Sequence, residues 1–226
     1  MRTIYLGMVG IALNYGWNEP LDPLDPTHVE AGERDMQFGL GWFAHPIFKD
    51  GTYPAVMREK VINRSVQFSA ITHRNYLLKI DLNSELQGFE ESRLPTFTEA
   101  ESAEIGGAFD FLGMNVYSTD LTYPGPGDVT SVSWYADKDT SVTDDAAWYT
   151  SGSSWLQVTP FAIRKVVNWL RKEYGQSVPI VITENGVSDR IGNLDDMQRV
   201  YFFKHYINQL LKGIYHGVTD VMDSLN

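Results

Sequence analysis

The chain has 226 residues, enough for one large domain, and its 18 basic and 29 acidic residues give a formal charge of −11. This acidic balance disfavours binding to nucleic acid or to an anionic membrane surface. A hydrophobic share of 43% excludes a disordered chain, and no uncharged apolar run is long enough for a membrane span. The absence of cysteine excludes disulfides, thiol nucleophiles and thiolate metal sites.

The N-terminal segment can be interpreted in two ways. Met8 to Leu13 is a short apolar run that predicts a fully buried strand. Arg2 ahead of this run also fits a weak signal peptide, but no small-residue cleavage site follows it. We therefore prefer the strand. The sequence does not decide the localisation, and an extracellular or membrane-associated full-length protein is one of the options.

Three helices are expected in the first half of the chain. Thr27 to Phe43 has acidic residues near its start and apolar residues at helical spacing, although two glycines weaken its end. A second helix is expected from Pro54 through Val61. Thr98 and Glu101 form a capping box, which predicts a short helix after them.

A buried strand is expected at Phe109 to Tyr117, and a very long loop after it. Ser118 to Ser154 is rich in Gly, Pro, Ser, Thr and Asp. Connections in compact domains are usually about 4 to 6 residues long, so a loop of this size is typical of a functional segment. Its aromatic residues are expected to pack the loop against itself rather than to bind a ligand.

The C-terminal part alternates helix, strand and helix. Thr159 and Pro160 are expected to start a helix that Gly175 ends. The β-branched run from Val178 to Thr183 predicts a buried strand. Asp195 to His216 predicts an amphipathic helix, with these residues expected to face inward: Val200, Phe203, Ile207, Leu210, Leu211 and Ile214. This alternation is typical of a parallel α/β fold.

Polar side chains stand where two of the expected strands end. Glu184 follows the second of these strands, and Asn115 and Tyr117 lie at the end of the first. Functional side chains of parallel α/β folds gather at these ends. A carboxylate with an amide and a phenol offers both donors and acceptors, which suits a hydroxyl-rich ligand such as a sugar.

Five segments, in order along the chain, resemble glycoside hydrolase family 1, the retaining β-glucosidases and β-galactosidases, and most closely its lactase-phlorizin hydrolase branch. The clearest segment is VITENG at Val181 to Gly186, which is similar to the nucleophile signature of that family. The other four are Gly39 to Pro54, RLPTF at Arg93 to Phe97, DFLGMNVYS at Asp110 to Ser118, and Val166 to Gly175.

The resemblance implies a (β/α)8 TIM barrel of which this chain covers a C-terminal part. Val9 to Leu13, Asp110 to Tyr117 and Pro179 to Glu184 would be strands five, six and seven. The motifs of the first four strands and of the eighth strand have no counterpart. Residues 1–226 are therefore expected to form a single partial barrel domain, whose exposed edges would favour oligomers or aggregates.

The resemblance also implies roles for individual residues. Glu184 would be the catalytic nucleophile, Tyr117 would hydrogen-bond and orient it, and Asn115 would lie at the glycone subsite. The family's second carboxyl, the general acid/base, has no match. Asn18-Glu19-Pro20 spells its tripeptide but stands in the context of the loop after strand five, so we do not expect Glu19 to be catalytic.

The function implied is hydrolysis of a β-glycoside substrate by a retaining mechanism, with little activity expected from this chain alone. The alternative is a non-hydrolytic protein of the same fold that binds carbohydrate or a partner. No cofactor and no metal are expected, because the five histidines lack ligand spacing and no glycine-rich phosphate loop occurs.

One stretch resembles nothing in the family. Residues 66–83 lie between two segments that do match it, Asn63 to Ser65 and Ser84 to Gln87. We expect a poorly ordered insertion here that contributes nothing to the site. An additional helix or strand is the alternative, because the runs VQFSAI and YLLKI are apolar enough to pack.

Overall fold

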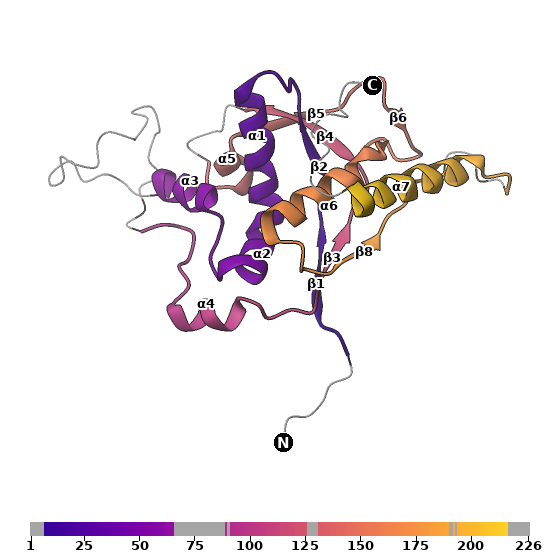
Figure 1. The fold of residues 1–226 in the computed structure, drawn as a ribbon. Coiled ribbons are helices and arrows are strands. Elements are labelled where there is room, and N and C mark those ends of the chain that lie inside the picture. Colours follow the sequence, from indigo (N-terminus) through magenta and orange to yellow (C-terminus); the bar gives the residue numbers. More distant parts are fainter. Residues whose placement is uncertain are drawn as a thin grey trace. The chain divides into compact units, whose positions relative to one another are not determined.

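The computed structural model describes residues 7–65, 89, 91–125, 131–189, 192 and 194–216 (Figure 1). The predicted insertion at 66–83 lies outside these residues. The chain divides into two compact units, which are described separately. Unit 1 contains Met1–Glu19, Gly107–Leu121 and Thr143–Asn226, and unit 2 contains Pro20–Gly106 and Thr122–Val142.

Unit 1 is built on a parallel sheet of three strands in the order β1-β3-β8. These strands are β1 (Gly10–Asn14), β3 (Phe111–Asn115) and β8 (Ile180–Glu184), which lie where the three strands were predicted. The burial predicted for all three is wrong for the two outer strands: Met8 and Val9 before β1 are 64% and 71% exposed, and Val181 of β8 is 42% exposed. Leu112 and Met114 of the central strand are fully buried. Gly113 between them allows close approach of both neighbours, because a Cβ there would lie 3.1 Å from Ala12 Cα and from Thr183 Cγ2.

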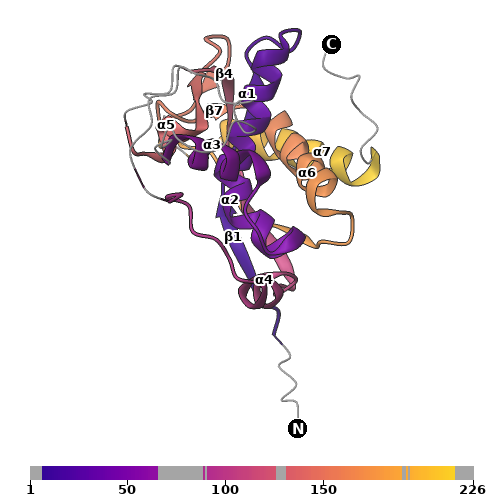
Figure 2. The same cartoon turned by 90° about the vertical axis from the view of Figure 1, so that its left-hand side faces the viewer.

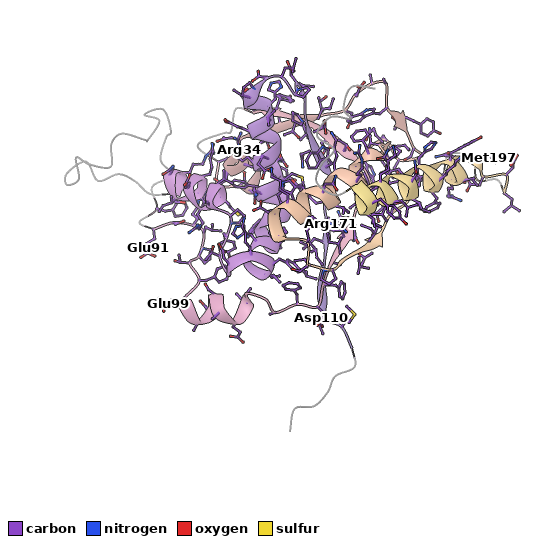
Figure 3. The ribbon with its side chains drawn as sticks, viewed as in Figure 1. Arg34, Glu91, Glu99, Asp110, Arg171 and Met197 are labelled. Atoms are coloured by element: carbon purple, nitrogen blue, oxygen red, sulfur yellow. The ribbon has the colours of Figure 1, made fainter. Side chains whose placement is uncertain are left out.

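Two helices of unit 1, α6 (Phe161–Tyr174) and α7 (Met197–His216), lie side by side (Figure 2). Arg171, labelled in Figure 3, donates from α6 to the Gly213 carbonyl of α7 at 3.1 Å. Gly175 ends the helix as predicted, at a φ of +94°. The apolar residues of α6 that face the core are buried: Ile163, Val166, Val167, Leu170 and Tyr174. The predicted cap was wrong: Pro160 is the N-cap residue, and the buried Thr159 hydroxyl has no hydrogen-bond partner.

The inward face predicted for α7 was also wrong. Five of its residues are 42–56% exposed, and they define an exposed stripe: Val200, Phe203, Ile207, Leu211 and Ile214. The buried face instead carries Phe202, Tyr206 and Gly213. Helix α7 has two apolar faces. Helix α6 packs against the face that carries Gly213, where the glycine lies next to Arg164 and Asn168 of α6.

The long loop predicted for Ser118 to Ser154 was wrong as well. It contains β4 (Thr119–Pro124), α5 (Trp134–Lys138), β5 (Thr140–Thr143) and β6 (Tyr149–Thr150). β4 is the middle strand of a sheet with β5 and β2 (Trp17–Pro20), and β6 pairs antiparallel with β7 (Gln157–Val158). Ser133 caps α5 by accepting from the Ala136 N–H at 3.1 Å. In this segment, polar residues that are typical of loops therefore cap and connect short helices and strands.

Unit 2 is mainly helical. α1 (Pro26–Met36) begins at Asp25, whose carboxylate accepts from the Thr27 N–H. The helical path continues beyond the predicted end at Phe43, past the two glycines expected to weaken it, through η1 (Gln37–Gly41), α2 (Trp42–His45) and η2 (Pro46–Asp50). It stops at Gly51, where φ is +75° and a Cβ would lie 2.4 Å from the Ser102 carbonyl oxygen. α3 (Ala55–Ser65) and α4 (Glu99–Ile105) follow, and α4 has the predicted capping box.

The core of unit 2 packs Trp134 of α5 against Phe38, Met57 and Val61. The Trp134 indole also donates to the Phe38 carbonyl oxygen at 2.9 Å. This tryptophan therefore packs against η1 and α3, whereas the sequence predicted packing within its own segment. The neighbouring Tyr135 is 75% exposed.

A network of ion pairs surrounds the end of α5. Lys138 contacts Asp35 at 2.6 Å, with side chains 8% and 1% exposed. Asp137 pairs with Arg93 at 2.7 Å, and Asp139 pairs with both Lys60 and Arg64. Three consecutive charged residues at the end of α5 and directly after it are thereby tied to α1, to α3 and to the segment before α4.

Asp35→Ala should destabilise the protein by about 3–5 kcal/mol, because it leaves the Lys138 ammonium buried without its partner. Urea denaturation followed by circular dichroism measures this loss. Glu30→Ala, at an exposed position of the same helix, is the matched control and should change stability by less than about 0.5 kcal/mol. Equal effects of the two substitutions would contradict this role of Asp35.

Candidate active site

The three residues singled out at strand ends come together at one edge of the unit 1 sheet. Asn115 is the last residue of β3 and is in register with Glu184, the last residue of β8. Because the strands are parallel, their carboxyl ends meet at this edge. Asp110, labelled in Figure 3, lies before β3 at the opposite end. Its N–H donates to the Val9 carbonyl at 2.7 Å, and its carboxylate Oδ2 accepts from the Val9 N–H at 2.6 Å.

A hydrogen bond joins two of these side chains directly. The Tyr117 hydroxyl donates to Oε2 of Glu184, whose side chain is exposed. Their backbones are also connected, since the Val116 N–H donates to the Glu184 carbonyl at 3.1 Å. The phenol predicted to orient the carboxylate therefore contacts it in the structure.

Neighbouring side chains fix the two strand ends. The Thr183 hydroxyl donates to Oδ1 of Asn115 at 2.6 Å, which holds the amide beside the end of β8. Asn185 donates from Nδ2 to the Val116 carbonyl at 2.7 Å. The register shifts between Met114 and Asn115, and such an irregularity can re-aim the side chains that follow.

The electrostatics of the pair favour a protonated phenol. The hydrogen bond to Glu184 raises the pKa of Tyr117 above its usual value, and partial burial and the carboxylate charge act in the same direction. Tyr117 therefore stays a hydrogen-bond donor at neutral pH. A donor that stays protonated at neutral pH keeps Glu184 oriented.

Tyr206 of α7 stabilises this arrangement through its hydroxyl, and it was not identified from the sequence. Its buried hydroxyl accepts from the Thr159 N–H at 3.1 Å and donates to the Tyr117 carbonyl at 2.7 Å. Burial raises the pKa of Tyr206 to about 12. Its position four residues after Phe202, on the buried face of α7, is the signal that could have identified it.

Glu19 has other partners. Both its carboxylate oxygens accept from the Lys165 ammonium, at 2.7 and 2.6 Å, and the Trp17 indole donates to Oε2. Lys165 also lies over the Trp17 and Phe161 rings, at 5.8 and 5.5 Å from their centroids. This half-buried ion pair gives Glu19 a structural role and supports its exclusion from catalysis.

Metal binding has no support from the described residues, in which no three His, Asp or Glu side chains are grouped to hold an ion. Within the same residues, no helix combines the length and the apolar character needed to cross a membrane.

Comparison with known proteins decides the family. Residues 2–222 match the model of glycosyl hydrolase family 1. The chain belongs to glycosyl hydrolase family 1. It is 41% identical to rat lactase/phlorizin hydrolase over 213 residues, which is 94% of this chain and 10% of that protein. It is 37% identical to a human lactase-like protein, covering 96% of this chain and 35% of that protein.

Solved structures of the same family give the architecture. A rice β-glucosidase superposes with a TM-score of 0.71 at 28% identity, covering 92% of this chain and 40% of the rice chain. This family 1 chain therefore has part of a TIM-barrel fold, and it spans well under half the length of the relatives it matches.

Tyr206→Phe should destabilise the chain by about 1–3 kcal/mol, because it leaves the Thr159 N–H and the Tyr117 carbonyl without their partner. Tyr215→Phe, at an 80% exposed position of the same helix, is the control and should be neutral. Chemical denaturation of both variants tests the role. A neutral Tyr206→Phe would show that the buried hydroxyl does not fix the strand end.

Proposed function

We propose that this chain is part of a retaining β-glycosidase that hydrolyses β-glucosides or β-galactosides, with Glu184 as its nucleophile. The observation that carries the proposal is the exposed Glu184 carboxylate at the end of β8, held by the Tyr117 hydroxyl. Membership of glycosyl hydrolase family 1 and likeness to a β-glucosidase support it.

In the proposed reaction, a Glu184 oxygen attacks the anomeric carbon and the bond to the leaving oxygen breaks. A second carboxyl group, about 5–5.5 Å away, gives that oxygen its proton. The same group then takes a proton from water, whose oxygen replaces Glu184 at the anomeric carbon and frees the enzyme. Tyr117 keeps the attacking carboxylate aimed, and Asn115 contacts the sugar at the glycone subsite.

The proposal assigns β1, β3 and β8 to strands five, six and seven of the barrel, and both units to one barrel domain with an insertion at 66–83. The acid/base carboxyl then belongs to the end of strand four, for which this sequence has no match. The ion pair of Glu19 with Lys165 supports this view, because it engages the carboxylate whose tripeptide resembles the acid/base motif. The alternative is a protein that binds carbohydrate or a partner without hydrolysis. Lack of hydrolysis by a protein with the complete barrel would favour this alternative.

The purified chain should hydrolyse β-glucosides very slowly, since losing general acid/base catalysis alone typically costs about 10² to 10⁴ in rate. Any residual release of p-nitrophenol from its β-glucoside should be abolished by Glu184→Gln and little changed by Glu19→Gln. If Glu19→Gln abolished this release and Glu184→Gln changed it little, the roles assigned to the two glutamates would be exchanged. Rapid hydrolysis of an unactivated glucoside would refute the need for a missing carboxyl.

The isolated chain should also self-associate. β1 and β8 are the outer strands of the described three-stranded sheet, and Val181 of β8 is 42% exposed. The exposed stripe of α7 adds aliphatic surface that favours association. Size-exclusion chromatography with light scattering should therefore show oligomers, which Ile207→Lys together with Leu211→Lys should reduce. A monodisperse monomer with a sharp cooperative melt would contradict this expectation.

A further inference from the structure

Unit 1 contains a pocket of about 370 Å³ between the β6-β7 hairpin and the first half of α7. Its lining includes none of the residues of the candidate active site. The lining residues are Tyr149, Val158, Gln198, Tyr201, Phe202 and His205.

The walls of this pocket are ordered by packing. Phe202 is only 3% exposed, with its ring stacked on Tyr206 at a centroid distance of 4.0 Å and set edge-on to Phe203 at 5.4 Å. Tyr149 and Tyr201 are 49% and 54% exposed, so their rings remain accessible to a ligand. A buried aromatic floor with two accessible aromatic walls is a preformed binding surface.

The pocket lies on a different face of α7 from the exposed stripe. Gln198, Tyr201, Phe202 and His205 follow the spacing i, i+3, i+4 and i+7, which aligns them along one side of the helix. The stripe is defined by other residues and runs along another side. Covering the stripe by association therefore does not require closing the pocket.

The chemistry of the lining selects the ligand. None of the lining residues is Asp, Glu, Lys or Arg, so a charged ligand would lose its hydration without gaining an ion pair. A sugar needs hydrogen bonds around its whole edge, which this largely apolar surface does not supply. An aromatic ring instead gains stacking or edge contacts with the two tyrosines and Phe202.

A few polar groups can orient such a ring. Gln198 donates from Nε2 to the Ser188 carbonyl at 3.1 Å, which fixes the side chain at the pocket. His205 and the tyrosine hydroxyls add donors and acceptors. We propose that this pocket binds a neutral aromatic ring carrying one polar substituent, such as a phenol, at a site separate from Glu184. The inference does not depend on glycosidase activity.

Ligand-observed saturation-transfer NMR on the full chain, with phenol and methyl β-glucoside as probes, tests the proposal. Phenol should receive saturation and methyl β-glucoside should not compete with it. Tyr149→Ala and Tyr201→Ala should each weaken phenol binding about tenfold, because each removes one aromatic wall. Tyr215→Ala, on the same helix but outside the lining, should leave binding unchanged, and so should Glu184→Gln.

Each other outcome overturns the inference in a recognisable way. Phenol binding that survives both pocket variants but is lost in Glu184→Gln would place the ring at the candidate active site, leaving the proposed function intact. If methyl β-glucoside competed with phenol, and Tyr149→Ala and Tyr201→Ala abolished this competition, the pocket would be a sugar site instead. Absence of phenol binding to the native chain would show that the pocket takes no aromatic ligand.

Discussion

The hydrogen bond from Tyr117 to Glu184 connects the ends of two parallel strands, and much of unit 1 serves to hold its partners. Parallel pairing of β3 with β8 brings the two residues to one edge of the sheet. Thr183 and Asn185 lock the strand ends from one side, while Tyr206 fixes the Tyr117 backbone from α7. Helix α7 thus contributes to the site through a buried hydroxyl that holds the backbone of Tyr117.

Two glutamates show how the same side chain acquires different roles. Glu184 is exposed at the end of a strand and accepts from a neutral phenol, so its carboxylate can still meet a ligand. Glu19 is half-buried, and its two oxygens are bound to the Lys165 ammonium. Short sequence motifs do not distinguish these cases, because Asn18-Glu19-Pro20 spells an acid/base tripeptide equally well. Context in the chain is what separates the two glutamates at the level of sequence, and in the structure they have different side-chain partners.

The sequence predicted those parts of the fold that local physics determines. The positions of the strands, the capping box of α4 and the end of α6 at Gly175 depend on residues close together in the chain, and they appear as expected. The burial of the outer strands β1 and β8 depends on neighbours distant in the chain and was predicted wrongly. The inward face of α7 depended on a choice between two apolar faces, which only the packing of α6 settles. β4 was missed because one of its pairing partners, β2, is distant in sequence. Tyr206 was missed for the same reason, since both its hydrogen-bond partners lie outside its own helix.

The most direct test of the account is the pKa of Tyr117, measured by NMR titration of ring-labelled tyrosine and assigned with Tyr117→Phe. We expect a Tyr117 pKa above the usual value of about 10 in the native chain. In Glu184→Gln, which lacks the carboxylate, we expect this pKa to be closer to the usual value. A phenol with a raised pKa adds stability that is present below pH 10 and is lost as the pH rises through its folded-state value. A Tyr117 pKa at the usual value, or one that Glu184→Gln leaves unchanged, would contradict the pairing on which the candidate site rests.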